Sequence, residues 1–517
     1  MRKKDFLIIP CLIICTIFTA IVWYIYYKTY FNGLVLNDAM DYAGIARNVA
    51  RGQGFISQYL TPLGLAHYGV PQPDMWRAPL WPLALAGFQK IFGFIDEASA
   101  LGTGFFFIAA SPLVFLLARQ WFGVLAAAGS VLVYTLTPEL LRCSISGMTE
   151  SMAVFLMLLV ILPASARGLK NTAGDWLSGA ALGLFYLARY NALLFLPFFL
   201  IYRWIYRKAG VRPPARMLAG FFLATSPWLI RNTILFGNPL FSLQKYEPVM
   251  FTASYPDYSL YLFDVKVNTL DFIITHTGEM AAKISANWND FVSSFLSPEL
   301  NGVTTAVFIV FLVSLLVPLD KKAAGIRPLM VACYLTQLAA LLVIHFIPRL
   351  FLVFAPLYII FALGALQALL SAGAGKARLR SLPVPLTLIA ILFLSFINYT
   401  IPGPPEKYVP DRIKYSKILG ELHAKVPGDQ VVLTNEGHLV SWYGDRYACK
   451  IPYSVDMVPE IKKRADFGAL FISDRILWHM PEADRSWKVF WYDHPREFNG
   501  FKFEKLLTNR GLVYYSF

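Results

Sequence analysis

The chain has 517 residues, of which 57% are hydrophobic and only 15% are charged. Soluble proteins average about 45–50% apolar and about 25% charged residues, so most of this chain is predicted to avoid water. The composition excludes a soluble enzyme, a disordered chain, a collagen-like chain and a small disulfide scaffold. The net charge of +14 is typical of the basic cytoplasmic loops of a membrane protein with many spans.

Apolar runs predict about eleven membrane-spanning helices. The first runs from Met1 to about Tyr27 and follows Arg2-Lys3-Lys4; it lacks a small-residue cleavage site, which favours a signal anchor. The other spans are expected near residues 98–118, 122–137, 149–166, 175–187, 191–202, 217–230, 303–319, 328–346, 350–372 and 382–400.

The basic loops indicate how the chain is oriented. With a cytoplasmic N-terminus, Lys/Arg-rich loops such as Arg203–Arg216 fall on the inside. Two long loops, residues 28–97 and 231–302, then lie on the outer face, and loops of this length are usually functional. Within the first loop, Pro79–Phe94 is apolar but short, which predicts a helix that lies in or re-enters the outer face.

The composition changes after the last apolar run. Residues 1–400 are expected to form the transmembrane domain, and residues 401–517 a small extracytoplasmic α/β domain. Helices are predicted at Arg412–Val426 and Val455–Ala465, and strands at Val431–Thr434, Ala469–Ser473, Val489–Tyr492 and Leu512–Phe517.

Two acids follow the first span. The segment from Asn37 to Phe55 is predicted to form an amphipathic helix on which Asp38 and Asp41, three residues apart, share a face. The alternative is that Asp38 only caps the helix and Asp41 favours its positive end. Because Trp76, Arg77 and further basic residues also fall at the outer boundary, we expect a cavity there that suits an amphiphilic substrate with a phosphate group.

Several motifs, in order along nearly the whole chain, resemble the GT-C glycosyltransferases. Within that class the chain is most similar to bacterial relatives of the protein O-mannosyltransferases (glycosyltransferase family 39) and the lipid A aminoarabinose transferases. The motifs are Asp38–Phe55, Arg77-Ala-Pro-Leu-Trp-Pro-Leu83, Thr149-Glu150-Ser151, Ala188-Arg189-Tyr190-Asn191, Pro227–Asn232 with Phe236–Pro239, and Pro348-Arg349-Leu350.

The resemblance implies a polytopic α-helical GT-C fold and an inverting hexosyl or pentosyl transferase. Its donor would be a polyprenyl-phosphate sugar, its acceptor a hydroxyl of a glycan, lipid or protein, and its place the bacterial inner membrane with a periplasmic active site. An essential Asp is expected in the first outer loop, and Asp38 matches it. Ala39 follows where protein mannosyltransferases have Glu, so the sequence departs from their pattern here and Asp41 is the second acid.

The residues themselves support the same chemistry. A phosphate leaves as an anion without a general acid, so one carboxylate, here Asp38, suffices to take the acceptor proton. Arginine binds phosphate oxygens in a bidentate manner, although arginines at span ends also reach headgroups with no specific role. The candidates for the donor phosphate are Arg77, Arg231, Arg349 and Arg189. Glu150 is a further catalytic candidate, or an acid that stabilises a helix start.

No cofactor is expected. The seven histidines show no metal-binding spacing, and a divalent cation would have to be held by Asp38, Asp41 and His67. The chain contains no P-loop or Rossmann fingerprint, which argues against a nucleotide-sugar as donor. The alternatives left open are a lipid-linked sugar transporter or flippase, and a non-catalytic glycan-binding subunit.

Overall fold

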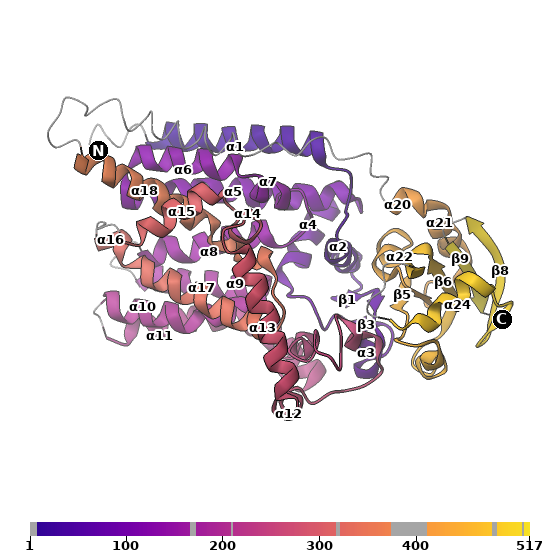
Figure 1. Cartoon of the computed structure of the whole chain (residues 1–517). Coiled ribbons are helices and arrows are strands. Elements are labelled where there is room, and N and C mark those ends of the chain that lie inside the picture. The colour runs from indigo at the N-terminus through magenta and orange to yellow at the C-terminus, as the bar shows by residue number, and fades with distance from the viewer. Residues whose placement is uncertain are drawn as a thin grey trace.

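Helices make up most of the protein, and a small sheet closes one end of it (Figure 1). The computed structural model describes residues 8–165, 172–207, 210–316, 321–373, 411–477, 483–508 and 511–516.

The helices of the bundle run side by side (Figure 1). They are α1 (Ile8–Tyr30), α5 (Asp96–Phe122), α6 (Val124–Leu136), α8 (Glu150–Ser165), α9 (Thr172–Ala188), α10 (Leu196–Arg207), α11 (Arg212–Phe236), α15 (Thr305–Ser314), α17 (Ile326–Val343) and α18 (Ala355–Gly373). The 3-10 segments η1 (Tyr190–Phe195) and η4 (Pro348–Phe354) precede α10 and α18.

These helices coincide with the expected spans, except that residues 382–400 lie outside the described residues. Among the described residues, four helical stretches are long and apolar enough to cross a membrane: Ile8–Tyr30, Asp96–Phe122, Ile326–Val343 and Pro348–Ala368. Shorter apolar helices lie at Val124–Leu136, Glu150–Ser165, Tyr190–Ile205 and Thr305–Ser314. The expected polytopic helical fold is therefore confirmed, whereas the number of spans stays a prediction.

Small residues allow two of these helices to pack closely. A Cβ atom on Gly179 of α9 would lie 1.9 Å from the backbone oxygen of Met217 on α11, and one on Gly220 would lie 2.5 Å from that of Trp176. Glycine at the contact lets two backbones approach, which is how helices commonly associate within a membrane.

The two long loops, residues 28–97 and 231–302, contain short elements. The first loop forms α2 (Asn37–Ala50), β1 (Ile56–Ser57), β2 (Tyr59–Leu60), α3 (Pro62–His67), β3 (Gln72–Pro73) and α4 (Leu80–Phe92). The second forms η2 (Leu243–Tyr246), η3 (Ser259–Leu262), α12 (Thr269–Thr275), α13 (Thr277–Ser294) and α14 (Pro298–Asn301). The helix expected near Pro79–Phe94 is α4, which buries Trp81 and Leu85. A further short helix, α7 (Pro138–Cys143), precedes α8.

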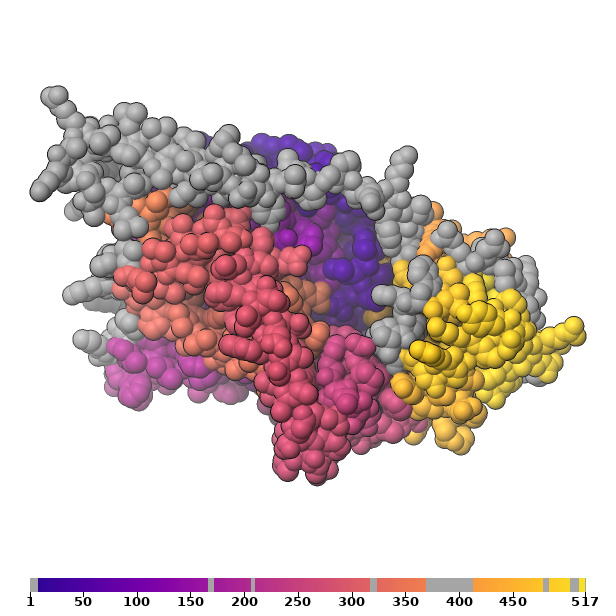
Figure 2. Space-filling view, in the orientation of Figure 1, coloured from indigo at the N-terminus to yellow at the C-terminus, as the bar shows by residue number. Residues whose placement is uncertain are grey.

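The C-terminal part holds a sheet with the strand order β2-β5-β4-β6-β9-β8-β7. Apart from β2, which was given above, the strands of this sheet are β4 (Val431–Thr434), β5 (Tyr447–Lys450), β6 (Phe467–Ser473), β7 (Glu497–Phe498), β8 (Phe501–Thr508) and β9 (Gly511–Ser516). The helices here are α20 (Asp411–Lys414), α21 (Ser416–Lys425), α22 (Gly437–Tyr443), η6 (Val455–Met457), α23 (Val458–Lys462), η7 (Asp474–Leu477), η8 (Arg485–Lys488) and α24 (Val489–Asp493). Figure 2 shows the C-terminal residues, in yellow, gathered at one end of the molecule.

The structure corrects one expectation and adds a strand. Val489–Tyr492 was predicted to be a strand and is the helix α24. Asp484 caps the preceding η8 through the amide of Ser486, and the chain continues in helical conformation from there. The edge strand β2 comes from the first outer loop and pairs in parallel with β5 at Tyr59–Ala448 and Leu60–Cys449. The sheet is thus shared between the two ends of the chain.

Candidate active site

The helix α2 carries both candidate acids. Leu36 occupies its N-cap position without a side-chain hydrogen bond. Asp38, in the first turn, directs its carboxylate to Arg77 and Arg349 instead. The capping role that the sequence left open for Asp38 is therefore not what the structure shows.

One arginine bridges the two acids. Arg77 donates from Nη2 to Asp38 over 2.8 Å and from Nε to Asp41 over 2.6 Å. Arg349 donates to the other carboxylate oxygen of Asp38 over 2.7 Å. Although burial opposes ionisation, the Arg77 and Arg349 guanidiniums hold the pKa of Asp38 well below its usual range. Burial raises the pKa of Asp41, an effect that Arg77 offsets only in part.

Arg189 and Glu150 form a second ion pair next to Arg349. Arg189 donates to the hydroxyl of Thr149 over 2.7 Å and to Glu150 over 2.6 Å. The Nε atom of Arg349 lies 3.8 Å from the same Glu150 oxygen. Arg349 therefore contacts both Asp38 and Glu150. The Glu150 side chain is only 3% exposed and is not among the described residues that line the cavity described next.

Asp74 was not identified from the sequence. Its Oδ1 atom accepts hydrogen bonds from the backbone amides of Trp76, over 3.1 Å, and Arg77, over 2.7 Å. The turn that presents the Arg77 side chain is thereby fixed. Burial and the nearby charge of Asp41 raise the pKa of Asp74 to about 7. The only signal in the sequence is an acid three residues before an arginine.

These groups face a cavity of about 760 Å³. One part of its lining is apolar and comes from the bundle elements η1, α17 and η4, with the residues Leu193, Leu194, Ala340, Leu341, Ile344, Ile347 and Leu350 on or beside them. The other part is polar and aromatic and comes from the two long loops, α22 and β5, with Tyr59, Gln72, Trp76, Gln244, Glu247, Tyr258, Tyr261, His438 and Lys450. Such a lining suits a molecule with an apolar and a polar end.

Two of the predicted site residues stand apart from this cluster. Arg231 is not among the described residues that line the cavity; it donates to the carbonyl of Asp74 over 3.1 Å and lies 4.3 Å from the ring centre of Trp228. His67 likewise lies outside this lining, with Nε2 2.9 Å from the Tyr246 hydroxyl. Arg231 thus supports the wall around Asp74 and does not face the cavity.

The acids do not form a ready cation site. In the described part of the chain, no three His, Cys, Asp or Glu side chains gather as metal ligands do. Asp38 and Asp41 already face guanidinium groups, and His67 faces Tyr246. This donor set does not fit a divalent cation.

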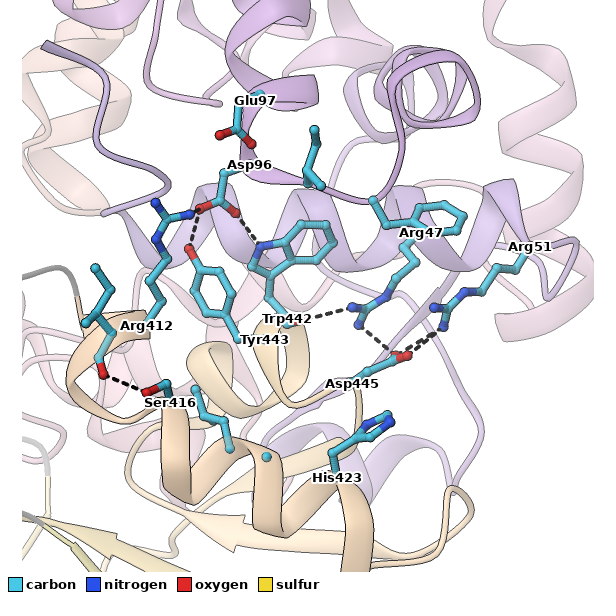
Figure 3. A pocket seen from close by; sticks show the side chains of 15 residues that line it. Arg47, Arg51, Asp96, Glu97, Arg412, Ser416, His423, Trp442, Tyr443 and Asp445 are labelled. Atoms are coloured by element: carbon cyan, nitrogen blue, oxygen red, sulfur yellow. Dashed lines mark hydrogen bonds and ion pairs between the residues drawn. The ribbon is translucent and has the colours of Figure 1, made fainter. Parts of the chain in front are cut away.

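The C-terminal region is held on the opposite face of α2. Figure 3 shows Arg47 directed toward the C-terminal region, where it donates to the carbonyls of Ser441, over 2.6 Å, and Trp442, over 2.7 Å. Asp445 lies 3.1 Å from Arg47 and 2.9 Å from Arg51. These contacts bind α2, the helix that carries Asp38 and Asp41, to α22 and to the turn that follows α22.

The buried acid Asp96 makes a second set of contacts with the C-terminal region. Three groups converge on Asp96 at the start of α5, and each donates over 2.8 Å: the Trp442 indole, the Tyr443 hydroxyl and Arg412 (Figure 3). A pocket of about 750 Å³ lies between the contacts of Arg47 and those of Asp96. The contacts around Arg47 and Asp96 together fix the position of the C-terminal region relative to the bundle.

This docking brings C-terminal residues into the cavity. His438 and Lys450 line it, and the His438 ring stacks on Tyr59 with centroids 3.7 Å apart. Burial, together with the charge of Arg77, lowers the pKa of His438 to about 3, so the ring is neutral at physiological pH. Neither residue was a candidate from the sequence, which gave no signal that they face the acids.

Solved structures show which class this fold defines. The ArnT of Cupriavidus metallidurans bound to undecaprenyl phosphate is similar with a TM-score of 0.62, at 11% identity, over 97% of each chain. The oligosaccharyltransferase of Archaeoglobus fulgidus in complex with Zn and sulfate has a TM-score of 0.58, at 13% identity, over 96% of this chain and 72% of that one. The protein has the GT-C glycosyltransferase fold, as its sequence motifs indicated.

One family model matches part of the sequence. Residues 76–230 match the family described as dolichyl-phosphate-mannose-protein mannosyltransferase. A third solved structure, AglB of Archaeoglobus fulgidus in complex with an inhibitory peptide and a dolichol-phosphate, is 14% identical over 92% of this chain and 70% of that one, with a TM-score of 0.55. No curated protein matches the chain by sequence.

Proposed function

We propose that the protein is a membrane glycosyltransferase that transfers a hexosyl or pentosyl group from a polyprenyl-phosphate donor to an acceptor hydroxyl, with inversion. The observation that carries the proposal is the placement of Asp38 between Arg77 and Arg349 in a cavity with one apolar and one polar side. The reaction takes place at the outer face of a bacterial inner membrane, with the C-terminal region in the periplasm.

The donor lies with its prenyl chain along the apolar lining and its phosphate at the arginines. Arg349 is the most accessible of the cluster: its side chain is 39% exposed, against 11% for Arg77 and 10% for Arg189. A guanidinium that can turn toward a ligand suits phosphate binding. The solved relatives bound to undecaprenyl phosphate and dolichol-phosphate support a donor of this kind.

Asp38 is the base in this proposal. Its two arginine partners keep it ionised and make it a weak base in the free protein. A donor phosphate that engages Arg349 would draw this cation away from Asp38 and so raise the basicity of the carboxylate when the substrate is present. The acceptor hydroxyl then loses its proton to Asp38 while it attacks the anomeric carbon from the side opposite the departing phosphate.

The other two acids orient arginines. Asp41 holds Nε of Arg77, and Glu150 holds Arg189 and lies next to Arg349. In a poorly solvated wall, such pairs fix the direction of the guanidinium groups before the substrate arrives. We therefore assign Asp41 and Glu150 positioning roles, Arg349 the main phosphate contact and Arg77 and Arg189 supporting ones.

The test is to purify the protein in detergent and identify co-purified lipid by mass spectrometry. We expect a polyprenyl-phosphate sugar, and Asp38→Asn should keep this lipid while transfer slows by about 100- to 10,000-fold. Asp290→Asn, an exposed acid on α13, is the control and should transfer at the normal rate. Normal transfer by Asp38→Asn, or a nucleotide-sugar as sole donor, would refute the proposal.

A further inference from the structure

Aromatic rings from three parts of the chain line the polar side of the cavity. Trp76 and Tyr261 meet edge to face with centroids 4.5 Å apart, and Tyr258 stacks on Tyr261 at 5.6 Å. Tyr59 and His438 form the second stack, described above. Rings fixed in pairs offer rigid faces at little entropic cost, because their rotamers are already restricted.

Hydrogen-bonding groups lie among these rings. Gln244 lines the cavity and donates to the carbonyl of Trp76 over 3.3 Å, which leaves its side-chain oxygen available as an acceptor. Glu247 also lines the cavity and lies close enough to Tyr261 for its charge to act on that hydroxyl. Amide and carboxylate groups of this kind bind hydroxyl groups.

The hydroxyl of Tyr261 is the most informative group. It is buried and has no hydrogen-bond partner among the described residues, although Tyr261 lines the cavity. A buried hydroxyl without a partner costs free energy, so an unsatisfied one beside a cavity indicates a ligand that satisfies it.

We propose that Tyr59, Trp76, Gln244, Glu247, Tyr258, Tyr261 and His438, here termed the acceptor wall, bind a saccharide and that the acceptor is a sugar hydroxyl. This inference rests on the proposed function. The rings pack against the C–H faces of the sugar, and the Tyr261 hydroxyl, Gln244 and Glu247 bind its hydroxyls. On transfer, the bond between the anomeric carbon and the donor phosphate breaks, the acceptor oxygen bonds to that carbon, its proton moves to Asp38, and polyprenyl phosphate leaves.

The backbone around the cavity argues against a peptide acceptor. A bound peptide often adds a strand to an exposed sheet edge, and its affinity then comes from main-chain hydrogen bonds. Of the strands next to the cavity, β1, β2 and β3 have two residues each, and β1 and β3 already pair with each other. The fourth, β5, contributes Lys450 and already pairs with β2 and β4. Recognition by side chains, as on the acceptor wall, suits a saccharide.

The test uses the full-length protein in detergent on an array that carries bacterial-envelope oligosaccharides and Ser/Thr-containing peptides. We expect oligosaccharides to be bound and the peptides not. Tyr261→Phe should bind about fivefold more weakly, as expected for one lost hydrogen bond. In transfer assays, Tyr261→Phe should raise the KM for the acceptor and leave the KM for the donor unchanged.

Tyr492→Phe is the matched control, since this tyrosine is 70% exposed on α24 and should bind like wild type. Binding of peptides in place of oligosaccharides, or equal oligosaccharide affinity of wild type and Tyr261→Phe, would overturn the inference. Oligosaccharide binding that depends on Tyr261, without any sugar transfer, would support the acceptor wall and contradict the proposed function. Failure of the acceptor-wall inference and failure of the proposed function therefore give different results.

Discussion

Asp38 and Arg349 are 311 positions apart in the chain, and their side chains are joined over 2.7 Å. Asp38 belongs to the first long loop, and Arg349 to η4, which leads into α18. The contact therefore ties this loop to the bundle at the point where the cavity has both an apolar and a polar lining.

Replacing Arg349 should weaken donor binding. Arg349→Gln removes the most accessible of the three arginines at the acids, and the loss of a charged hydrogen bond predicts about 10- to 100-fold weaker binding of undecaprenyl phosphate. Equilibrium binding to the lipid in nanodiscs measures this. Arg142→Gln, an exposed arginine paired with Glu139, is the control. Unchanged lipid affinity in Arg349→Gln would show that its phosphate role is wrong.

Replacing Arg77 should destabilise the protein. Arg77→Met leaves the buried Asp41 without a cation, and breaking such a pair from one side costs about 3–5 kcal/mol. The double variant Arg77→Met/Asp41→Asn removes the stranded charge and should recover part of the lost stability. Thermal unfolding in detergent provides the comparison. If the double variant is less stable than Arg77→Met, Asp41 does not depend on Arg77 in the way that we infer.

The stability of the protein should fall as the pH rises from about 4 to about 7. The pKa of Asp74 rises to about 7 on folding, so the folded protein keeps a proton that the unfolded chain releases above about pH 4. This contribution is complete below about pH 4 and is lost as the pH rises through 7. Glu247, whose pKa burial also raises to about 7, acts in the same direction.

The measurement is the Tm of wild type and Asp74→Asn at several pH values. Asparagine keeps the acceptor for the amides of Trp76 and Arg77 and removes the titration. We expect a smaller fall in Tm with pH for this variant, and the wild-type profile for Asp290→Asn. Parallel profiles for Asp74→Asn and wild type would exclude Asp74 as a contributor.

Replacing Arg47 should loosen the C-terminal region. Its side chain is 5% exposed, and Arg47→Met leaves the carbonyls of Ser441 and Trp442 and the Asp445 carboxylate without this donor, for a loss of about 3–5 kcal/mol. Arg51→Met, on the same helix but 34% exposed, should cost less than about 1 kcal/mol. Hydrogen exchange of the amides of α22 reports the difference. Equal exchange in the two variants would show that Arg47 does not secure the docking.

The sequence predicted the bundle well and the short strands less well. Long apolar runs such as those of α5 and α18 indicate a span by themselves, because a bilayer requires about 20 apolar residues. A run of four, such as Val489–Tyr492, is compatible with either a strand or a helix. Its helical form follows from the preceding η8, which Asp484 caps.

Part of the candidate site was also accessible from the sequence. Helical spacing put Asp38 and Asp41 on one face, and Arg77 does contact both. The rule that arginines at outer span ends bind phosphate does not separate Arg349 from Arg231. The helix α11 continues to Phe236, so Arg231 lies within it and turns toward Trp228.

The contribution of the C-terminal region was not predictable. His438 and Lys450 belong to a segment with its own strand pattern, and local patterns do not show where such a segment docks. Its position depends on buried tertiary contacts, chiefly those of Arg47 and Asp96.

The strand β2 limits how the protein can be divided experimentally. Because Tyr59 and Leu60 pair with β5, a fragment that begins after the bundle would expose the backbone of β5 as a free edge. Free edges recruit other strands, so such a fragment is expected to self-associate. Domain-exchange experiments should therefore carry residues 56–60 together with the C-terminal region.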